Sequence, residues 1–288
     1  MRWTVPTPLD HFAALVGTDD GFPLTEAAVA IAMAEHPALD VQGVLAELDG
    51  LALRLQRRIP ADASAEQRVR LLHRFFFDEL GFSGNANDFY SVRNSHVHEV
   101  LRTRRGIPIT LAVIYLELAT QIGLRVQGVS FPGHFLVRLS LPEGDAVMDP
   151  LTGESLSREA IEEWAAPFLE RQRPEAGLGS AGRAEMLRHL LAPATPREII
   201  ARMLRNLEAL HQSSDDPAKV LPIQQRLVAL LPSEWSRRRD RGYTLADLGQ
   251  TQEAIDDLSA YLDRAGDAAD LAQVRAHLMT LRGRRSSR

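Results

Sequence analysis

The first third of the chain carries apolar residues at helical spacing. They recur through residues 41–55, behind Asp40 as a helix cap, and Pro60 closes the stretch. An earlier alanine-rich stretch, with Thr25 in the capping position, predicts a further helix. We therefore expect residues 1–90 to form a helical bundle, the N-terminal part of a larger core.

A capping-box pattern predicts where the next helix begins. Ser64 is followed three residues later by Gln67, so each side chain can bind the other residue's backbone N–H. The apolar pattern behind this pair continues to Gly81, a residue type that commonly ends helices. This helix completes the predicted N-terminal bundle.

The middle of the chain predicts a buried helix followed by an antiparallel sheet. Residues 109–122 are almost all apolar, with Pro108 suited to the first helical position and Gly123 as the stop. Residues 126–139 then contain two short β-branched and aromatic stretches around a Pro-Gly turn, and a second turn predicts a third strand. The fold class is therefore α+β, with residues 91–170 as the core.

The remainder of the chain predicts a separate helical domain. Residues 171–185 contain proline, glycine and serine and suggest a linker, whereas residues 186–288 have a purely helical composition. Two segments there match at an offset of about 34 residues, the period of tetratricopeptide repeats. In the second copy, Gly242, Gly249 and Ala254 have the spacing at which small residues allow two helices to cross closely. We expect a C-terminal α-superhelix.

Composition narrows the possible functions. The chain has 288 residues, 45% of them hydrophobic, and a net charge of -5, which argues against nucleic acid or an anionic membrane as a necessary partner. It has no cysteine, which excludes disulfides, thiolate metal sites and every thiol mechanism. No secretion signal or membrane-spanning stretch is indicated, so we expect a cytoplasmic protein.

A histidine and an aspartate near the predicted sheet suggest a catalytic arrangement. His134 stands at the entrance of the second strand and Asp149 follows the third, positions able to hold a base and its orienting carboxylate. The nucleophile is not evident from these residues alone.

These residues carry a family resemblance. The stretch NSHVHEVLRTRRGIPITLAVIYLELATQIGLRVQGVSFPGHFLVRL, followed by MDPLTG, resembles the bacterial SirB-type proteins, which join a transglutaminase-like, papain-like core to tetratricopeptide repeats. In the wider superfamily a cysteine opens the buried helix, a histidine enters the next strand and an aspartate ends the following one. The resemblance places His134 and Asp149 at the last two positions, whereas Pro108 occupies the cysteine position and Thr110 is the nearest hydroxyl.

Two interpretations of this degenerate triad compete. In one, Thr110 is the nucleophile, or a water is activated, with His134 as base and Asp149 as orienter, giving a hydrolase or acyl transferase. In the other, the histidine and aspartate are a structural polar pair, and a mid-helix threonine bonds back to its own helix. The cleft would then bind a ligand or protein without chemistry. We favour this second interpretation, a cysteine-less pseudoenzyme with a regulatory role.

A histidine-rich segment precedes the buried helix. His96, His98 and Glu99 are residue types that bind metals, but at helical spacing His98 points away from the other two, so we expect no metal or cofactor. Glu99 and Asn94 are candidate binding residues. The Asn94 side chain could face the cleft or cap the following turn, and we favour the cap.

An arginine cluster occurs near a helix start in the repeats. Arg238 and Arg239 belong to it, and a solvated surface is the simpler interpretation. The sharper hypothesis is that they line a groove for an acidic protein or peptide partner. The sequence does not indicate the partner's identity or the oligomeric state.

Overall fold

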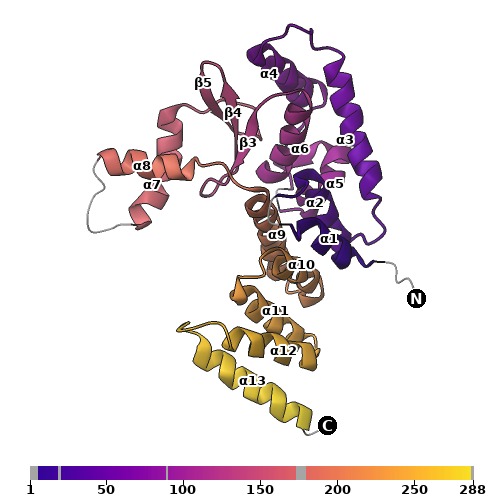
Figure 1. Ribbon diagram of the computed structural model, residues 1–288, viewed down its shortest axis with the longest axis vertical. Helices are drawn as coiled ribbons and strands as arrows, with labels where there is room; N and C mark the ends of the chain where they lie inside the picture. The colour runs from indigo at the N-terminus through magenta and orange to yellow at the C-terminus, as the bar shows by residue number, and fades with distance from the viewer. Residues whose placement is uncertain (1–5, 19–20, 89, 173–179, 287–288) are drawn as a thin grey trace. The chain divides into compact units, whose positions relative to one another are not determined.

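The chain folds into two compact units. The structure is a computed structural model that describes residues 6–18, 21–88, 90–172 and 180–286 (Figure 1). The unit that we call the sheet unit consists of Pro23–Val29 and Asp40–Met203. The unit that we call the repeat unit comprises the described residues of Met1–Phe22, Ala30–Leu39 and Leu204–Arg288.

Helices of the first third begin largely where the sequence predicts. Asp40 caps the second of them through a bond from the Gly43 amide to its carboxylate (2.9 Å), and the Ser64–Gln67 capping box forms in full. Both predicted starts are confirmed. The elements are α2 (Leu24–Ile31), a 3₁₀ turn η1 (Ala32–Ala34), α3 (Val41–Gln56), α4 (Ala65–His73) and a π-helix η2 (Arg74–Glu79).

Two details of this part differ from the sequence prediction. Thr25 is not a helix cap, because α2 already begins at Leu24, and its hydroxyl donates instead to the carboxylate of Glu117. The helix that starts at Ser64 also changes to π geometry in its last part, before Gly81 with its positive φ of 70°. Such widened turns occur frequently at functional sites.

The buried central helix α6 (Pro108–Gln121) is confirmed. Proline occupies its first turn, and the helix ends where the Gly123 and Leu124 amides bond back to the carbonyls of Thr120 and Ala119, a glycine-based stop. It is preceded by β1 (Ser83–Gly84), η3 (Val92–Ser95), α5 (Val97–Thr103) and β2 (Arg105–Gly106), with β1 and β2 pairing in parallel.

The predicted antiparallel sheet is also confirmed. It has the order β3 (Val126–Val129), β4 (Leu136–Leu141), β5 (Gly144–Met148), with Val129 opposite Leu136. One face packs against α6. Side chains of the other face, including Val129 and Leu136, pack on α7 (Arg158–Gln172) and α8 (Ser180–Leu190), so that the sheet lies between α6 and these two helices (Figure 1).

The predicted linker falls partly outside the described residues. Within 171–185, residues 173–179 are not described, whereas α7 runs to Gln172 and α8 begins at Ser180. The domain boundaries expected from the sequence stay a prediction.

The repeat unit is a stack of helices. It contains α1 (Pro8–Val16), the later part of α9 (Pro196–Ser213), α10 (Pro217–Leu230), α11 (Trp235–Asp247), α12 (Thr251–Leu262) and α13 (Leu271–Ser286), with α10 to α13 packing on one another in chain order. A Cβ at Gly242 would lie 2.8 Å from Leu258 Cγ, which confirms the close crossing of α11 and α12. Gly249 instead serves the turn between them, with a φ of 73°. No helix among the described residues has the length and apolar character that a membrane span requires.

Candidate functional site

Thr110 lies in the first turn of α6 and is completely buried. Among the described residues its hydroxyl oxygen has no hydrogen-bond partner. The backbond to the helix that is common for threonine is also missing, and the residue four positions earlier, Gly106, precedes the first residue of α6. A nucleophilic hydroxyl needs both a base and an approach for the substrate, and the Thr110 hydroxyl has neither.

His134 lies on the other side of the sheet from α6. Its ring stacks on Trp164 of α7, with centroids 4.0 Å apart and planes 15° from parallel. Trp164 in turn packs against the cluster that contains Val129 and Leu136, the side chains that the sheet directs towards α7 and α8. The imidazole is half-buried against α7, and no described hydrogen bond joins it to Thr110 or Asp149.

An arginine holds the turn that carries His134. Arg202 donates from Nη1 to the Ser130 hydroxyl and to the Phe131 carbonyl, both at 2.9 Å, and lies over the Phe135 ring. Burial without a described carboxylate partner lowers the pKa of its guanidinium. Arg202 therefore positions the loop before β4, a contact that the sequence did not reveal because the residues are far apart in the chain.

Asp149 shapes its own turn. Its Oδ1 accepts from the Leu151 amide at 2.8 Å, and its carbonyl accepts from the Gly153 amide at 2.8 Å. Gly153 is required there, because its φ is 77° and a Cβ would lie 2.5 Å from the Phe77 ring. The described hydrogen bonds thus give Asp149 a local role and do not join it to His134; the proposed catalytic role stays a prediction.

Asn94 is buried and holds the loop before the central helix. Its amide nitrogen donates to the Asp88 carbonyl at 2.7 Å, and its side-chain oxygen accepts from Asn85 at 3.0 Å. Its own carbonyl accepts the Ile107 amide, next to the first residue of α6. The side chain therefore braces the loop and the start of α6, rather than capping a single turn.

Glu99 is partnered by its neighbours on α5. It accepts a hydrogen bond from Arg102 at 2.7 Å, which lowers the pKa of its carboxyl, and lies 3.7 Å from the His98 ring nitrogen. The rings of His96 and His98 stack with centroids 5.8 Å apart. Among the described residues no group of three histidine, aspartate or glutamate side chains is arranged to hold a metal ion.

Arg238 and Arg239 are bound within the repeat unit. Arg238 pairs with Asp257 at 3.3 Å, and Arg239 pairs with Asp240 and Asp270, both at 2.6 Å. Paired in this way, their charges bind α11 to α12 and to the start of α13. Contact with a peptide as well would require these ion pairs to be shared or exchanged, and it stays a prediction.

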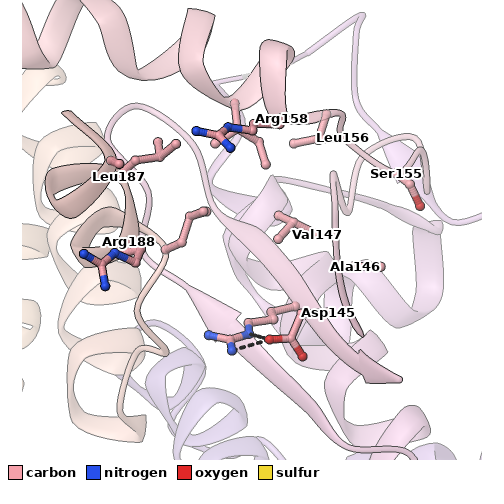
Figure 2. A pocket seen from close by; sticks show the side chains of 12 residues that line it. Asp145, Ala146, Val147, Ser155, Leu156, Arg158, Leu187 and Arg188 are labelled. Carbon is pink, nitrogen blue, oxygen red and sulfur yellow. Dashed lines mark hydrogen bonds and ion pairs between the residues drawn. The ribbon is translucent and has the colours of Figure 1, made fainter. Parts of the chain in front are cut away.

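A cleft on the α7–α8 face of the sheet was missed by the sequence analysis. Its volume is about 860 Å³, and Figure 2 shows Arg158 and Arg188 of the two helices and Asp145 of β5 around it, with Val147 and Leu187 between them. The one feature of the sequence that could have indicated this cleft is Arg138, a charged residue within the otherwise mostly apolar strand β4. The lining comprises Arg138, Asp145, Ala146, Val147, Ser155, Leu156, Arg158, Ile161, Ala184, Leu187, Arg188 and Leu191.

Comparisons with known proteins agree with this architecture. Residues 42–205 match the model of the transglutaminase-like superfamily, and residues 207–279 match a tetratricopeptide repeat model. A UPF0162 protein of Xylella fastidiosa is 35% identical over 93% of this chain and 92% of its own. The UPF0162 proteins of Pseudomonas aeruginosa and Escherichia coli (YchA) are 34% and 23% identical over 73% and 89% of this chain, and over 72% and 91% of their own lengths.

Proposed function

Because the chain belongs to the transglutaminase-like superfamily and to the UPF0162 family, we propose that it is a cysteine-less member that acts by binding rather than by acyl transfer. The grouping with SirB-type proteins, a regulatory role, and residence in the cytoplasm belong to the same proposal. The observation that carries it is the state of Thr110: its hydroxyl is sealed and unpartnered, and His134 lies on the opposite face of the sheet.

The repeats are the proposed contact for a protein or peptide partner. Tetratricopeptide repeats generally mediate protein interactions. Trp235 of α11 is flanked by the guanidinium groups of Arg238 and Arg264, 5.5 and 5.3 Å from its ring centroid, and tryptophan and arginine are enriched among energetically dominant interface residues. Arg264 is exposed and has no described ion pair, so its charge is available to a partner.

An acylation assay separates binding from catalysis. The full chain would be incubated with p-nitrophenyl acetate, and ester hydrolysis compared among the wild type, Thr110→Val and His134→Gln. We expect all three to give the same slow background rate and no acyl-enzyme burst. A burst that disappears in Thr110→Val would refute the proposal.

A hydrolase that activates a water is the second candidate. One observation favours it: His134 and Asp149 are both only partly buried, so solvent reaches them without passing the sealed hydroxyl of Thr110. This candidate requires that His134→Gln lower the hydrolysis rate while Thr110→Val leaves it unchanged. Equal rates in both variants would exclude it for the ester used.

Partner binding has a separate test. Partners captured by the wild-type chain would be identified by mass spectrometry and then titrated against Arg264→Glu and the control Arg275→Glu, an exposed arginine of α13. We expect the first charge reversal to weaken binding and the second to leave it unchanged. Equal affinities for both variants would remove the Trp235 surface from the proposal.

A further inference from the structure

The cleft between β5 and the α7–α8 pair has a distinct chemical character. Its floor is aliphatic, formed by Val147, Leu156, Ile161, Leu187 and Leu191, and no aromatic side chain lines it. An aliphatic floor suits a flexible hydrocarbon chain, whereas planar ligands usually bind against aromatic rings. The volume of about 860 Å³ lies in the range of small-molecule sites.

The rim of the cleft is positively charged. Arg138, Arg158 and Arg188 come from β4, α7 and α8, and Asp145 is the one carboxylate among the lining residues. Asp145 is engaged by Arg138, with an Nε to Oδ2 distance of 2.9 Å. The charge of that pair is balanced, so an anionic ligand would have to bind Arg158 and Arg188, whose glutamate partners lie outside the lining of this cleft.

The other two arginines are free to exchange their partners. Arg158 bonds to Glu162 at 2.7 Å and Arg188 to Glu185 at 3.5 Å, in each case a residue one turn away on the same helix. All four side chains are at least half exposed, and such ion pairs contribute little. A ligand anion that bridges the two helices could bind both guanidinium groups in their place.

A second hollow lengthens the cleft between the helices. It has a volume of about 210 Å³, shares Arg158, Ala184 and Leu187 with the first, and adds Glu162, Ala166, Leu169 and Arg183. The space is thus elongated and largely aliphatic. Its rim carries arginines and one carboxylate, Glu162, which an anionic head group would have to displace from Arg158.

We propose that this cleft binds a small anionic amphiphile, an unbranched aliphatic chain with a terminal carboxylate or similar anion. The chain would lie on the aliphatic floor between β5 and α8, with its head group between Arg158 and Arg188. Binding here does not depend on the repeat unit or on the inertness of Thr110, and it goes beyond the proposed function.

The test uses the full chain and dodecanoate below its micellar concentration. Titration calorimetry measures affinity, and ¹³C-methyl NMR locates binding through the Val147, Ile161 and Leu187 methyl groups, with Leu53, an exposed residue of α3, as the reference. We expect one dodecanoate site per chain, with chemical-shift changes confined to the methyl groups of the cleft. The affinity for dodecanol should be lower than that for dodecanoate by about tenfold, the contribution of a charge-assisted contact.

Matched variants identify the groups responsible. Arg158→Gln/Arg188→Gln should weaken dodecanoate binding by about tenfold or more, and Ala184→Trp should block the cleft. Arg57→Gln/Arg125→Gln, which removes two exposed arginines outside the lining, should leave affinity unchanged. Circular dichroism confirms that each variant is folded.

Four results would overturn the proposal. They are equal affinity for dodecanol and dodecanoate, shifts outside the cleft, unchanged binding in Ala184→Trp, and no binding of dodecanoate at all. Binding to phosphatidylglycerol vesicles or to an acidic helical peptide without binding to dodecanoate would likewise overturn it, and would assign the surface to a membrane or to a protein.

Discussion

Replacing Arg226 by methionine should stabilise the repeat unit. Arg226 of α10 is only 2% exposed, and its guanidinium makes a single described hydrogen bond, from Nη1 to the Pro222 carbonyl at 3.0 Å. Nε and Nη2 have no partner among the described residues, and the guanidinium carbon lies over the Phe12 ring of α1, 5.8 Å from its centroid. Among the described residues no carboxylate pairs with this cation, and burial lowers its pKa well below the ordinary value, to about 10.

The magnitude follows from that pKa. Lowering the pKa of a guanidinium to about 10 corresponds to roughly 3 kcal/mol that opposes folding while the group is charged. Methionine has no charge, but its side chain loses the bond to Pro222 and the contact with Phe12, together about 1–2 kcal/mol. We expect a net gain of about 1–2 kcal/mol in the free energy of unfolding, in line with other buried cations replaced by apolar residues.

The destabilisation caused by the buried charge of Arg226 depends on pH only in the alkaline range. The pKa of Arg226 is lower in the folded than in the unfolded chain, so the unfolded chain binds more protons once the pH exceeds about 10. The destabilisation is therefore complete below about pH 10 and is relieved only as the pH rises above it. The gain from methionine should be the same at pH 6 and pH 8.

The assay combines urea unfolding with hydrogen exchange. Urea midpoints and slopes report the free energy, and exchange of the α10 amides reports the repeat unit itself. Arg275→Met is the control, an exposed arginine of the same unit expected to change stability by less than about 0.5 kcal/mol. A loss of more than about 1 kcal/mol in Arg226→Met would refute the reasoning, because the buried charge would then be compensated.

Three further predictions concern stability and titration. Thr110→Val should raise the free energy of unfolding measured in urea by about 1 kcal/mol, because it removes an unpartnered buried hydroxyl. The control Thr120→Val loses a 2.7 Å hydrogen bond to the Leu116 carbonyl and should not raise the free energy of unfolding. A lower free energy of unfolding in Thr110→Val would contradict this prediction. Asp257→Asn should lower the free energy of unfolding, measured by thermal unfolding, by about 3–5 kcal/mol. Asp257 is only 4% exposed and accepts hydrogen bonds from Arg241 at 2.5 and 2.7 Å, so the variant leaves a partly buried cation without its partner. The control Asp256→Asn, at an exposed position, should leave the free energy of unfolding unchanged. In Arg102→Ala, NMR titration should show the pKa of Glu99 rising towards its ordinary value of 4.5. In the wild type the ion pair stabilises the fold above that pH, and this stabilisation is lost as the pH falls through the lowered pKa. An unchanged titration midpoint in the variant would show that Arg102 does not cause the lowered pKa.

Local signals allowed much of the fold to be predicted. The Ser64–Gln67 box, the proline-to-glycine limits of α6 and the two turns of the sheet depend on neighbouring residues, and the structure forms all of them. Thr25 was misassigned for a tertiary reason. Its side chain bonds to Glu117, which is distant in the chain, and the cap preference of threonine could not reveal that.

The candidate site was less predictable, because it depends on which faces meet. The sequence placed His134 at a strand entrance, but not on the face that packs against Trp164. The cleft requires α7 and α8 to cover β4 and β5, and the burial of Arg226 requires α1 to pack on α10. The ion pairs of Arg238 and Arg239 likewise join residues in different helices.

Acylation at Thr110 tests the central claim most directly. The full chain would be exposed to an excess of an activated ester or a fluorophosphonate, digested, and mapped by mass spectrometry, with Thr120 as an exposed threonine of the same helix for comparison. A sealed hydroxyl with no base beside it should carry no adduct, so the peptide that contains Thr110 should keep its unmodified mass. A stoichiometric adduct on Thr110 that depends on His134 would contradict the account.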